Sequence, residues 1–145
     1  MSVSPLTEAQ WQALSLEAER ARRRAYAPYS GYKVGAALLT DRGVVRGCNV
    51  ENASYPLCVC AEAATVAKAV GMGRRTFLAL AVATEGPEPG APCGACRQIL
   101  AEFALDLPLA LVVAGVPRTY TSVRALLPLA FTPQILAEST TSKRL

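Results

Sequence analysis

The chain has 145 residues, a length that fits one compact domain over 1–145 with a hydrophobic core of its own. Hydrophobic residues make up 52% of it, yet no stretch reaches the roughly 18 to 20 uninterrupted apolar residues of a membrane-spanning helix, so no membrane partner is expected. The net charge of +4 is modest, and the basic residues are not interleaved with aromatic ones over a wide surface, which disfavours a nucleic-acid-binding protein. The apolar excess instead predicts a buried interface between subunits.

The first predicted element is a helix. It covers residues 6–25, where leucine and alanine sit among glutamate and arginine, and Thr7 is its candidate N-cap. Pro28 and Gly31 follow directly, and neither residue continues a helix. The helix is therefore expected to end in a loop before the first strand.

The rest of the chain alternates between predicted strands and helices. A hairpin comes first, made of strand 34–40, turn 41–43 and strand 44–50. Apolar and alanine-rich runs then predict helices over 60–70 and 93–103, and strands over 77–84, 109–113 and 118–121. Two short helices, 123–127 and 133–138, close the order. This alternation predicts a sheet with helices packed on its faces, and tails at 1–5 and 139–145 that are flexible.

The cysteines indicate a reducing compartment. There are five, an odd number, and residues 1–10 lack the basic run and apolar stretch of a signal peptide. Both features predict a cytoplasmic protein with reduced thiols. A cysteine cluster in such a protein favours metal binding or catalysis over disulfides.

Cys60, Cys93 and Cys96 form a candidate zinc site. Cys93 and Cys96 are three residues apart at a predicted helix start, so they share one face, and Cys60 begins another predicted helix. Free N–H groups at helix starts favour thiolates, which zinc prefers as ligands. The chain contains no histidine, so a catalytic site with three thiolates and one open position follows unless Cys48 or Cys58 fills it.

Glu62 gives this cluster a possible chemistry. It lies two residues beyond Cys60, close enough to exchange protons with a water at the metal without ligating the ion. Two alternatives remain. A thiol–disulfide oxidoreductase would use Cys93 and Cys96 as a redox pair, and a structural zinc site would leave Glu62 without a purpose. Cys48 and Cys58 are expected to be small buried hydrophobic residues.

Several motifs around the cluster resemble cytidine deaminases of the short, homotetrameric, zinc-dependent type. They are the residues 26–30, Tyr-Ala-Pro-Tyr-Ser; 34–38, Val-Gly-Ala-Ala-Leu; 47–53, Gly-Cys-Asn-Val-Glu-Asn-Ala; 93–98, Cys-Gly-Ala-Cys-Arg-Gln; and Leu-Leu-Pro at 126–128 followed by Phe131. The resemblance covers about residues 14–136. It implies a three-layer α/β/α fold with a central five-stranded mixed sheet.

The same resemblance implies an activity in pyrimidine salvage. Cys60, Cys93 and Cys96 would bind one Zn²⁺ per chain, and activated water would attack C4 of the cytosine ring of cytidine or 2'-deoxycytidine. Glu62 would protonate N3 and help ammonia leave. The partner is then a small nucleoside, and the sites would lie at the subunit interfaces of a homotetramer. A deaminase of a cytosine nucleoside analogue such as blasticidin is an alternative, and a polynucleotide editor is disfavoured by the absence of an evident strand-binding surface.

The resemblance also assigns substrate-binding residues. Asn49 and Glu51 match a ribose-binding pair, and residues two apart on a strand point the same way, so both can face one sugar. Tyr32 stands where the family usually has phenylalanine near the base, and a tyrosine keeps the stacking face and adds a hydroxyl. The remaining assignments are Ala61 within the Cys-Ala-Glu motif, and Tyr55 and Phe131 as contacts between subunits.

The sequence departs from the family pattern at Ala63, where arginine is common and hydrogen-bonds the zinc thiolates. Three thiolates on Zn²⁺ leave a net charge of about −1, which weakens the metal as a Lewis acid unless donors offset it. Helix N–H groups and Arg97 are the candidate donors. We expect Ala63→Arg to alter the rate or its pH profile.

Overall fold

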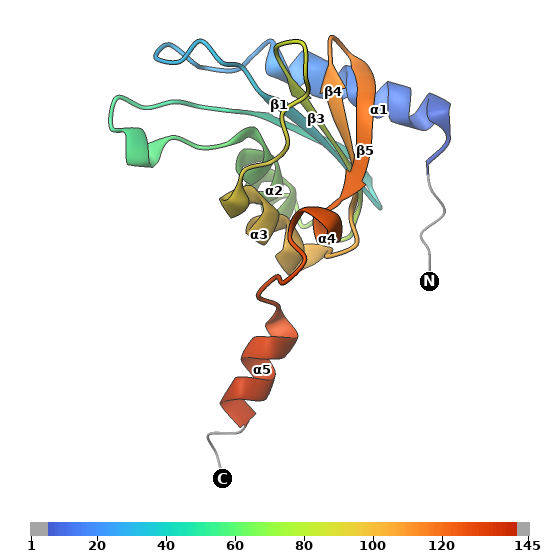
Figure 1. Cartoon of the computed structure of the whole chain (residues 1–145), viewed down its shortest axis with the longest axis vertical. Helices are drawn as coiled ribbons and strands as arrows, with labels where there is room; N and C mark the ends of the chain where they lie inside the picture. Colours follow the sequence, from blue (N-terminus) through green and yellow to red (C-terminus); the bar gives the residue numbers. More distant parts are fainter. Residues whose placement is uncertain (1–5, 142–145) are drawn as a thin grey trace.

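A mixed sheet lies at the centre of the computed structural model, which describes residues 6–141 (Figure 1). Its strands within that range are β1 (Gly35–Thr40), β2 (Gly43–Cys48), β3 (Phe77–Thr84), β4 (Pro108–Val113) and β5 (Val116–Ser122). They lie in the order β2-β1-β3-β4-β5. β3 and β4 run parallel, and the other neighbouring pairs are antiparallel. The predicted five-stranded mixed sheet and the β1–β2 hairpin are therefore confirmed.

Helices cover both faces of this sheet. α1 (Glu8–Arg22) packs across one face, and α2 (Ala61–Gly71), α3 (Gly94–Phe103) and α4 (Val123–Leu126) lie on the other (Figure 1). α5 (Pro133–Thr141) extends away from the sheet. The three layers confirm the expected fold.

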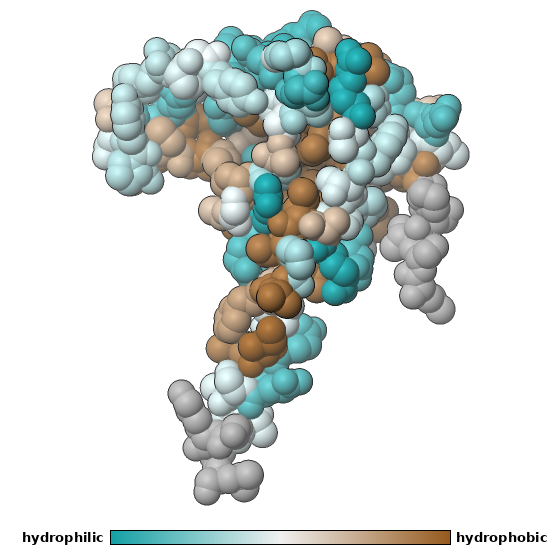
Figure 2. Space-filling model, in the orientation of Figure 1, coloured by the Kyte–Doolittle hydropathy of each residue, from teal (hydrophilic) through white to brown (hydrophobic). Residues whose placement is uncertain are grey.

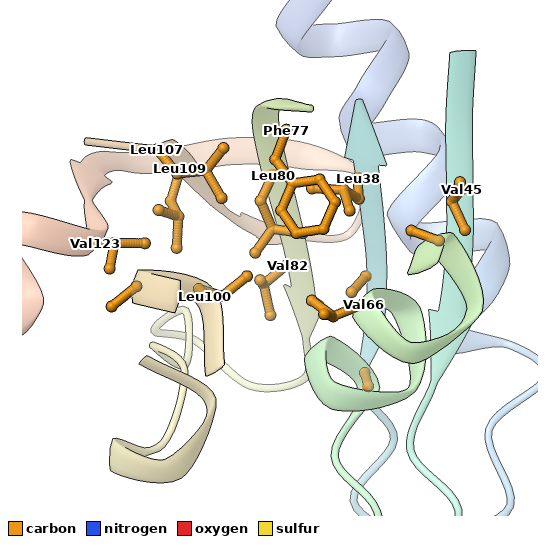
Figure 3. Close-up of a cluster of buried hydrophobic side chains, with 14 of the residues drawn as sticks. Leu38, Val45, Val66, Phe77, Leu80, Val82, Leu100, Leu107, Leu109 and Val123 are labelled. Atoms are coloured by element: carbon orange, nitrogen blue, oxygen red, sulfur yellow. The ribbon is translucent and has the colours of Figure 1, made fainter. Parts of the chain in front are cut away.

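The alternation of side chains along β3 builds a core on each face. Leu80 and Val82 point into the cluster that contains Val66 of α2 and Leu100 of α3 (Figure 3). The intervening alanines, Ala79, Ala81 and Ala83, face the cluster under α1. Small residues on that face let α1 lie close to the sheet.

Two glycines mark where helices approach the sheet most closely. A Cβ at Gly35 of β1 would lie 2.2 Å from the backbone oxygen of Ala18 in α1. A Cβ at Gly47 of β2 would lie 2.3 Å from Oγ1 of Thr65 in α2 and 2.9 Å from its backbone nitrogen. These close contacts determine how far each helix lies from its strand. Since Cys60 is the N-cap of α2, the contact at Gly47 also helps to position that cysteine.

The predicted N-cap of α1, Thr7, is confirmed, but the helix is shorter than residues 6–25, since it runs from Glu8 to Arg22. The Thr7 hydroxyl accepts from Gln10 N, and the Gln10 side chain accepts from Thr7 N, which completes a capping box. The predicted end at residue 25 is wrong, because Tyr26 N donates to Asn49 O and Glu51 N donates to Tyr26 O. This pairing with the segment after β2 draws the chain out of the helical path after Arg23, the C-cap.

Smaller differences from the prediction lie near other element ends. A short 3₁₀ helix, η1 (Tyr55–Leu57), was not expected, and β5 is longer than residues 118–121. α5 continues through residues 139–141, which were expected in a flexible tail; the remaining predicted tail residues, 1–5 and 142–145, lie outside the described residues. None of the helices within residues 6–141 combines the length and the apolar composition that a membrane-spanning helix requires.

Candidate metal centre and active site

The starts of α2 and α3 bring the three predicted cysteines together. Cys60 is the N-cap of α2, Cys93 is the N-cap of α3, and Cys96 lies in the first turn of α3. Their sulfur atoms all lie within 4.8 Å of one another, and the Cys60 and Cys93 sulfurs are 3.8 Å apart. Tetrahedral zinc with Zn–S bonds of about 2.3 Å separates its sulfurs by about 3.8 Å. The donor set and its spacing therefore fit zinc.

The other two cysteines do not join this cluster. Cys58 is exposed and its sulfur lies 3.3 Å from the backbone nitrogen of Asn52, while Cys48 is half-buried at the end of β2. The prediction that Cys48 and Cys58 are not ligands is consistent with this placement, but the prediction that they are buried is wrong. All five cysteines lie in the described part of the chain, and all are free thiols. The site thus offers three sulfurs and keeps a fourth position open.

A helix N–H group favours the thiolate form at one of the three cysteines, Cys93, and not at the other two. The backbone N–H of Cys96 donates to the Cys93 sulfur and lowers the pKa of that thiol. Burial raises the pKa of the Cys60 and Cys96 thiols, so their thiolate forms need a neighbouring positive charge. A divalent metal ion supplies such a charge, because coordination deprotonates a thiol.

Glu62 lies beside the cluster without being part of it. Its side chain is in the first turn of α2 and the residue is 5% exposed. Burial raises the pKa of its carboxyl group. A carboxyl group with a raised pKa holds a proton more readily than an exposed one and can still release it, which is what general acid–base catalysis requires.

Arg97 does not take the place of the missing arginine at position 63. Its Nε donates to Pro92 O at 2.7 Å and its Nη1 donates to Leu126 O at 2.9 Å. Both groups are therefore occupied by backbone carbonyls, and the side chain joins the start of α3 to the end of α4. Among the two candidate donors considered for Ala63, the helix N–H groups are the ones that reach a thiol.

Asn49 and Glu51 follow β2 and contact the loop after α1. The Asn49 side chain accepts from Val34 N at 2.8 Å and donates to Tyr32 O at 2.9 Å. The Glu51 carboxylate accepts from Tyr29 N at 2.8 Å, from Ser30 N at 3.2 Å and from the Ser30 hydroxyl. The Ser30 hydroxyl in particular lowers the pKa of Glu51, so this carboxylate stays ionised.

A cavity of about 280 Å³ opens beside Glu51, lined by Tyr29, Ser30, Glu51, Tyr55 and Cys58. The rings of Tyr29 and Tyr55 lie 6.0 Å apart in an edge-to-face arrangement on its wall. Tyr29, Ser30 and Cys58 were not predicted as site residues. The sequence did indicate Tyr29 and Ser30 indirectly, because both lie within the family-like motif at residues 26–30.

The other predicted substrate-binding residues are spread around this region. Tyr32 is exposed and its hydroxyl lies near Gly90, whereas Ala61 is fully buried at the start of α2. Phe131 is exposed and lines a different cavity, next to α5. Its carbonyl accepts from Gln98 Nε2 at 2.7 Å. A single chain therefore does not place Phe131 in the cavity beside Glu51.

Comparison with known proteins gives one consistent result. The family described as the cytidine and deoxycytidylate deaminase zinc-binding region matches residues 8–109. The chain is 44% identical over 128 residues to a cytidine deaminase from Sporosarcina psychrophila, covering 87% of this chain and 94% of the relative. It is 53% identical over 93 residues to a cytidine deaminase from Halalkalibacterium halodurans, covering 63% and 70% of the two chains.

A solved structure supports the same grouping. The crystal structure of a cytidine deaminase from Burkholderia pseudomallei superposes with a TM-score of 0.80 at 48% identity, covering 87% of this chain and 100% of that one. The matched family is defined by a zinc-binding region, which excludes the redox-dithiol alternative for the cysteine cluster. The chain belongs to the cytidine and deoxycytidylate deaminase family.

Proposed function

We propose that this protein hydrolyses cytidine and 2'-deoxycytidine to uridine and 2'-deoxyuridine with release of ammonia. The observation that carries the proposal is the convergence of two helix starts, which gathers the sulfurs of Cys60, Cys93 and Cys96 beside a buried carboxyl group, that of Glu62. Relatives named cytidine deaminases support the substrate class. The protein is thus a zinc hydrolase acting on a C–N bond.

The chemistry needs one metal and one proton carrier. Zinc held by three protein ligands supplies Lewis-acid chemistry and makes water a nucleophile near neutral pH. Glu62 takes a proton from the attacking water, protonates N3 of the ring and assists the amino group as it leaves. A C4–O bond forms and the C4–N4 bond breaks, so one water is consumed and one ammonia is released. The raised pKa of Glu62 suits a group that both accepts and donates protons.

Binding of the nucleoside is assigned to residues around the cavity. Asn49 and Glu51 are proposed to bind the sugar hydroxyls, since Glu51 lines the cavity and Asn49 lies two residues before it on the same segment after β2. Four further residues complete the proposed site: Tyr32 and Ala61 near the base, and Tyr55 and Phe131 at a boundary between subunits.

A homotetramer is the proposed assembly, with each site completed by a neighbouring chain. Phe131 and Tyr55 are 55% and 70% exposed in the single chain, although both are large and apolar. Figure 2 shows further hydrophobic side chains on α5, where Ile135 and Leu136 are exposed. Surfaces of this kind usually mark contacts with another protein chain. Free thiols throughout the chain suit the reducing cytoplasm, where pyrimidine salvage takes place.

The substrate is tested by ultraviolet spectroscopy on a zinc-loaded sample. Mixing with cytidine should lower the absorbance on the long-wavelength side of the cytidine band as uridine forms, and 2'-deoxycytidine should behave alike. Turnover of blasticidin without turnover of cytidine would instead identify a deaminase of nucleoside analogues. Light scattering tests the assembly, since a monomer at micromolar concentration would contradict the tetramer.

A further inference from the structure

The Glu51 carboxylate is held in place by three hydrogen bonds from the loop after α1. Oε2 accepts from the successive backbone nitrogens of Tyr29 and Ser30, at 2.8 and 3.2 Å, and Oε1 accepts from the Ser30 hydroxyl. Successive backbone N–H groups of this kind form an anion-binding concavity. The loop after α1 therefore binds a carboxylate that comes from a different part of the chain.

The Ser30 hydroxyl is itself oriented. Its oxygen accepts from the backbone nitrogen of Tyr32 at 3.0 Å, which leaves its single proton free to point at Glu51. Gly31 lies between the two residues with φ +68, a backbone conformation that suits glycine, and its nitrogen donates to Ala27 O at 2.9 Å. This turn aims the hydroxyl and the two backbone N–H groups at one carboxylate.

The number of bonds limits what Glu51 can still accept. An ionised carboxylate has about four acceptor sites. Three are taken by Tyr29 N, Ser30 N and the Ser30 hydroxyl, and two of these bonds fall on Oε2. The remaining site lies on Oε1, the oxygen that the Ser30 hydroxyl fixes. Glu51 can thus take one further hydrogen bond, in a direction that Ser30 sets.

We infer that Ser30 is a positioning residue for nucleoside binding, which orients Oε1 of Glu51 to accept one sugar hydroxyl. The inference rests on the proposed function, and it adds a residue that does not itself need to touch the substrate. Ser30 also lowers the pKa of Glu51, which keeps the carboxylate an acceptor rather than a donor. Loss of the hydroxyl should weaken binding and leave the chemical step at the metal unaffected.

The test compares Ser30→Ala with the wild-type zinc-loaded enzyme on two substrates, cytidine and 2',3'-dideoxycytidine. Without the Ser30 hydroxyl, Oε1 of Glu51 is no longer oriented toward the sugar, so the hydrogen bond between the sugar hydroxyl and this charged group is lost. The KM for cytidine should therefore rise roughly tenfold, while kcat changes less than about twofold. The KM for the dideoxy substrate, which has no 2' or 3' hydroxyl to bind, should not change. Ser30→Thr, which keeps the hydroxyl, should restore the wild-type KM for cytidine.

Ser54→Ala is the matched control, because Ser54 is exposed nearby and its hydroxyl does not cap η1. It should leave both KM values unchanged. Should Ser30→Ala fail to fold, Ser30→Cys keeps the shape with a weaker donor and is judged by the same comparison. An unchanged KM for cytidine, or an equal rise for both substrates, would overturn the role of Ser30. A wild-type enzyme that converts neither substrate would overturn the proposed function as well.

Discussion

Gly47→Ala tests whether the close packing of α2 on β2 determines the geometry of the metal centre. The added Cβ would lie 2.3 Å from Thr65 Oγ1, 2.9 Å from Thr65 N and 3.1 Å from Ala61 O. Ordinary contacts begin near 3.4 Å, so α2 must move by up to about 1 Å at its first turns. The first turn of α2 carries Glu62 and follows Cys60 directly. A shift of about 1 Å in a catalytic group can lower the rate by about a hundredfold.

The stability cost follows from the same contacts. Overpacking of a well-filled site typically costs about 1 to 3 kcal/mol, which corresponds to a fall in Tm of about 3 to 10 °C for a chain of this size. The assays are kcat/KM for cytidine, bound zinc and thermal unfolding. Gly71→Ala is the matched control, because a Cβ at this last residue of α2 meets nothing within 4 Å. Wild-type kcat/KM in Gly47→Ala, with Tm unchanged, would refute the argument that this contact sets the position of α2.

Three further predictions concern the metal centre. Glu62→Gln should lower kcat by about 10² to 10⁴ and retain zinc, because the amide cannot carry a proton; near-normal kcat would exclude Glu62 as the proton carrier. Removal of zinc with a chelator should abolish turnover and lower Tm, since metal binding stabilises the folded state, and added zinc should restore both; activity that survives complete removal would contradict a zinc enzyme. Ala63→Arg should change the pH profile of kcat, and identical profiles would show that the helix N–H groups already balance the thiolate charge.

The sequence predicted those parts of the molecule that depend on local patterns. β3 matches the predicted strand over residues 77–84, because a buried apolar run leaves little ambiguity in its limits. The cysteines were predicted at helix starts because an N-cap position and a spacing of three residues are both local features. The positions of the cysteines on their helices were thus predictable from local patterns, whereas the meeting of the two helix starts at one point is seen in the folded chain.

Contacts between distant segments account for what the sequence did not predict. α1 ends early because Tyr26 pairs with residues near position 50, a partner that no local pattern names. Arg97 was a candidate donor to the thiolates, but its partners, Pro92 and Leu126, are carbonyl groups that only the folded chain brings near. Ser30 likewise acquires its role from Glu51, 21 residues away. A pattern of residue types does not show which backbone N–H and C=O groups will meet, so hydrogen-bond partners of this kind are identified only from the structure.

Zinc content measured together with cytidine turnover, on the same preparation, tests the central claim most directly. We expect about one tightly bound zinc per chain and conversion of cytidine to uridine, with Glu62→Gln retaining the zinc and losing the conversion. A preparation that holds its zinc and converts no cytosine nucleoside would contradict a deaminase site built from Cys60, Cys93, Cys96 and Glu62.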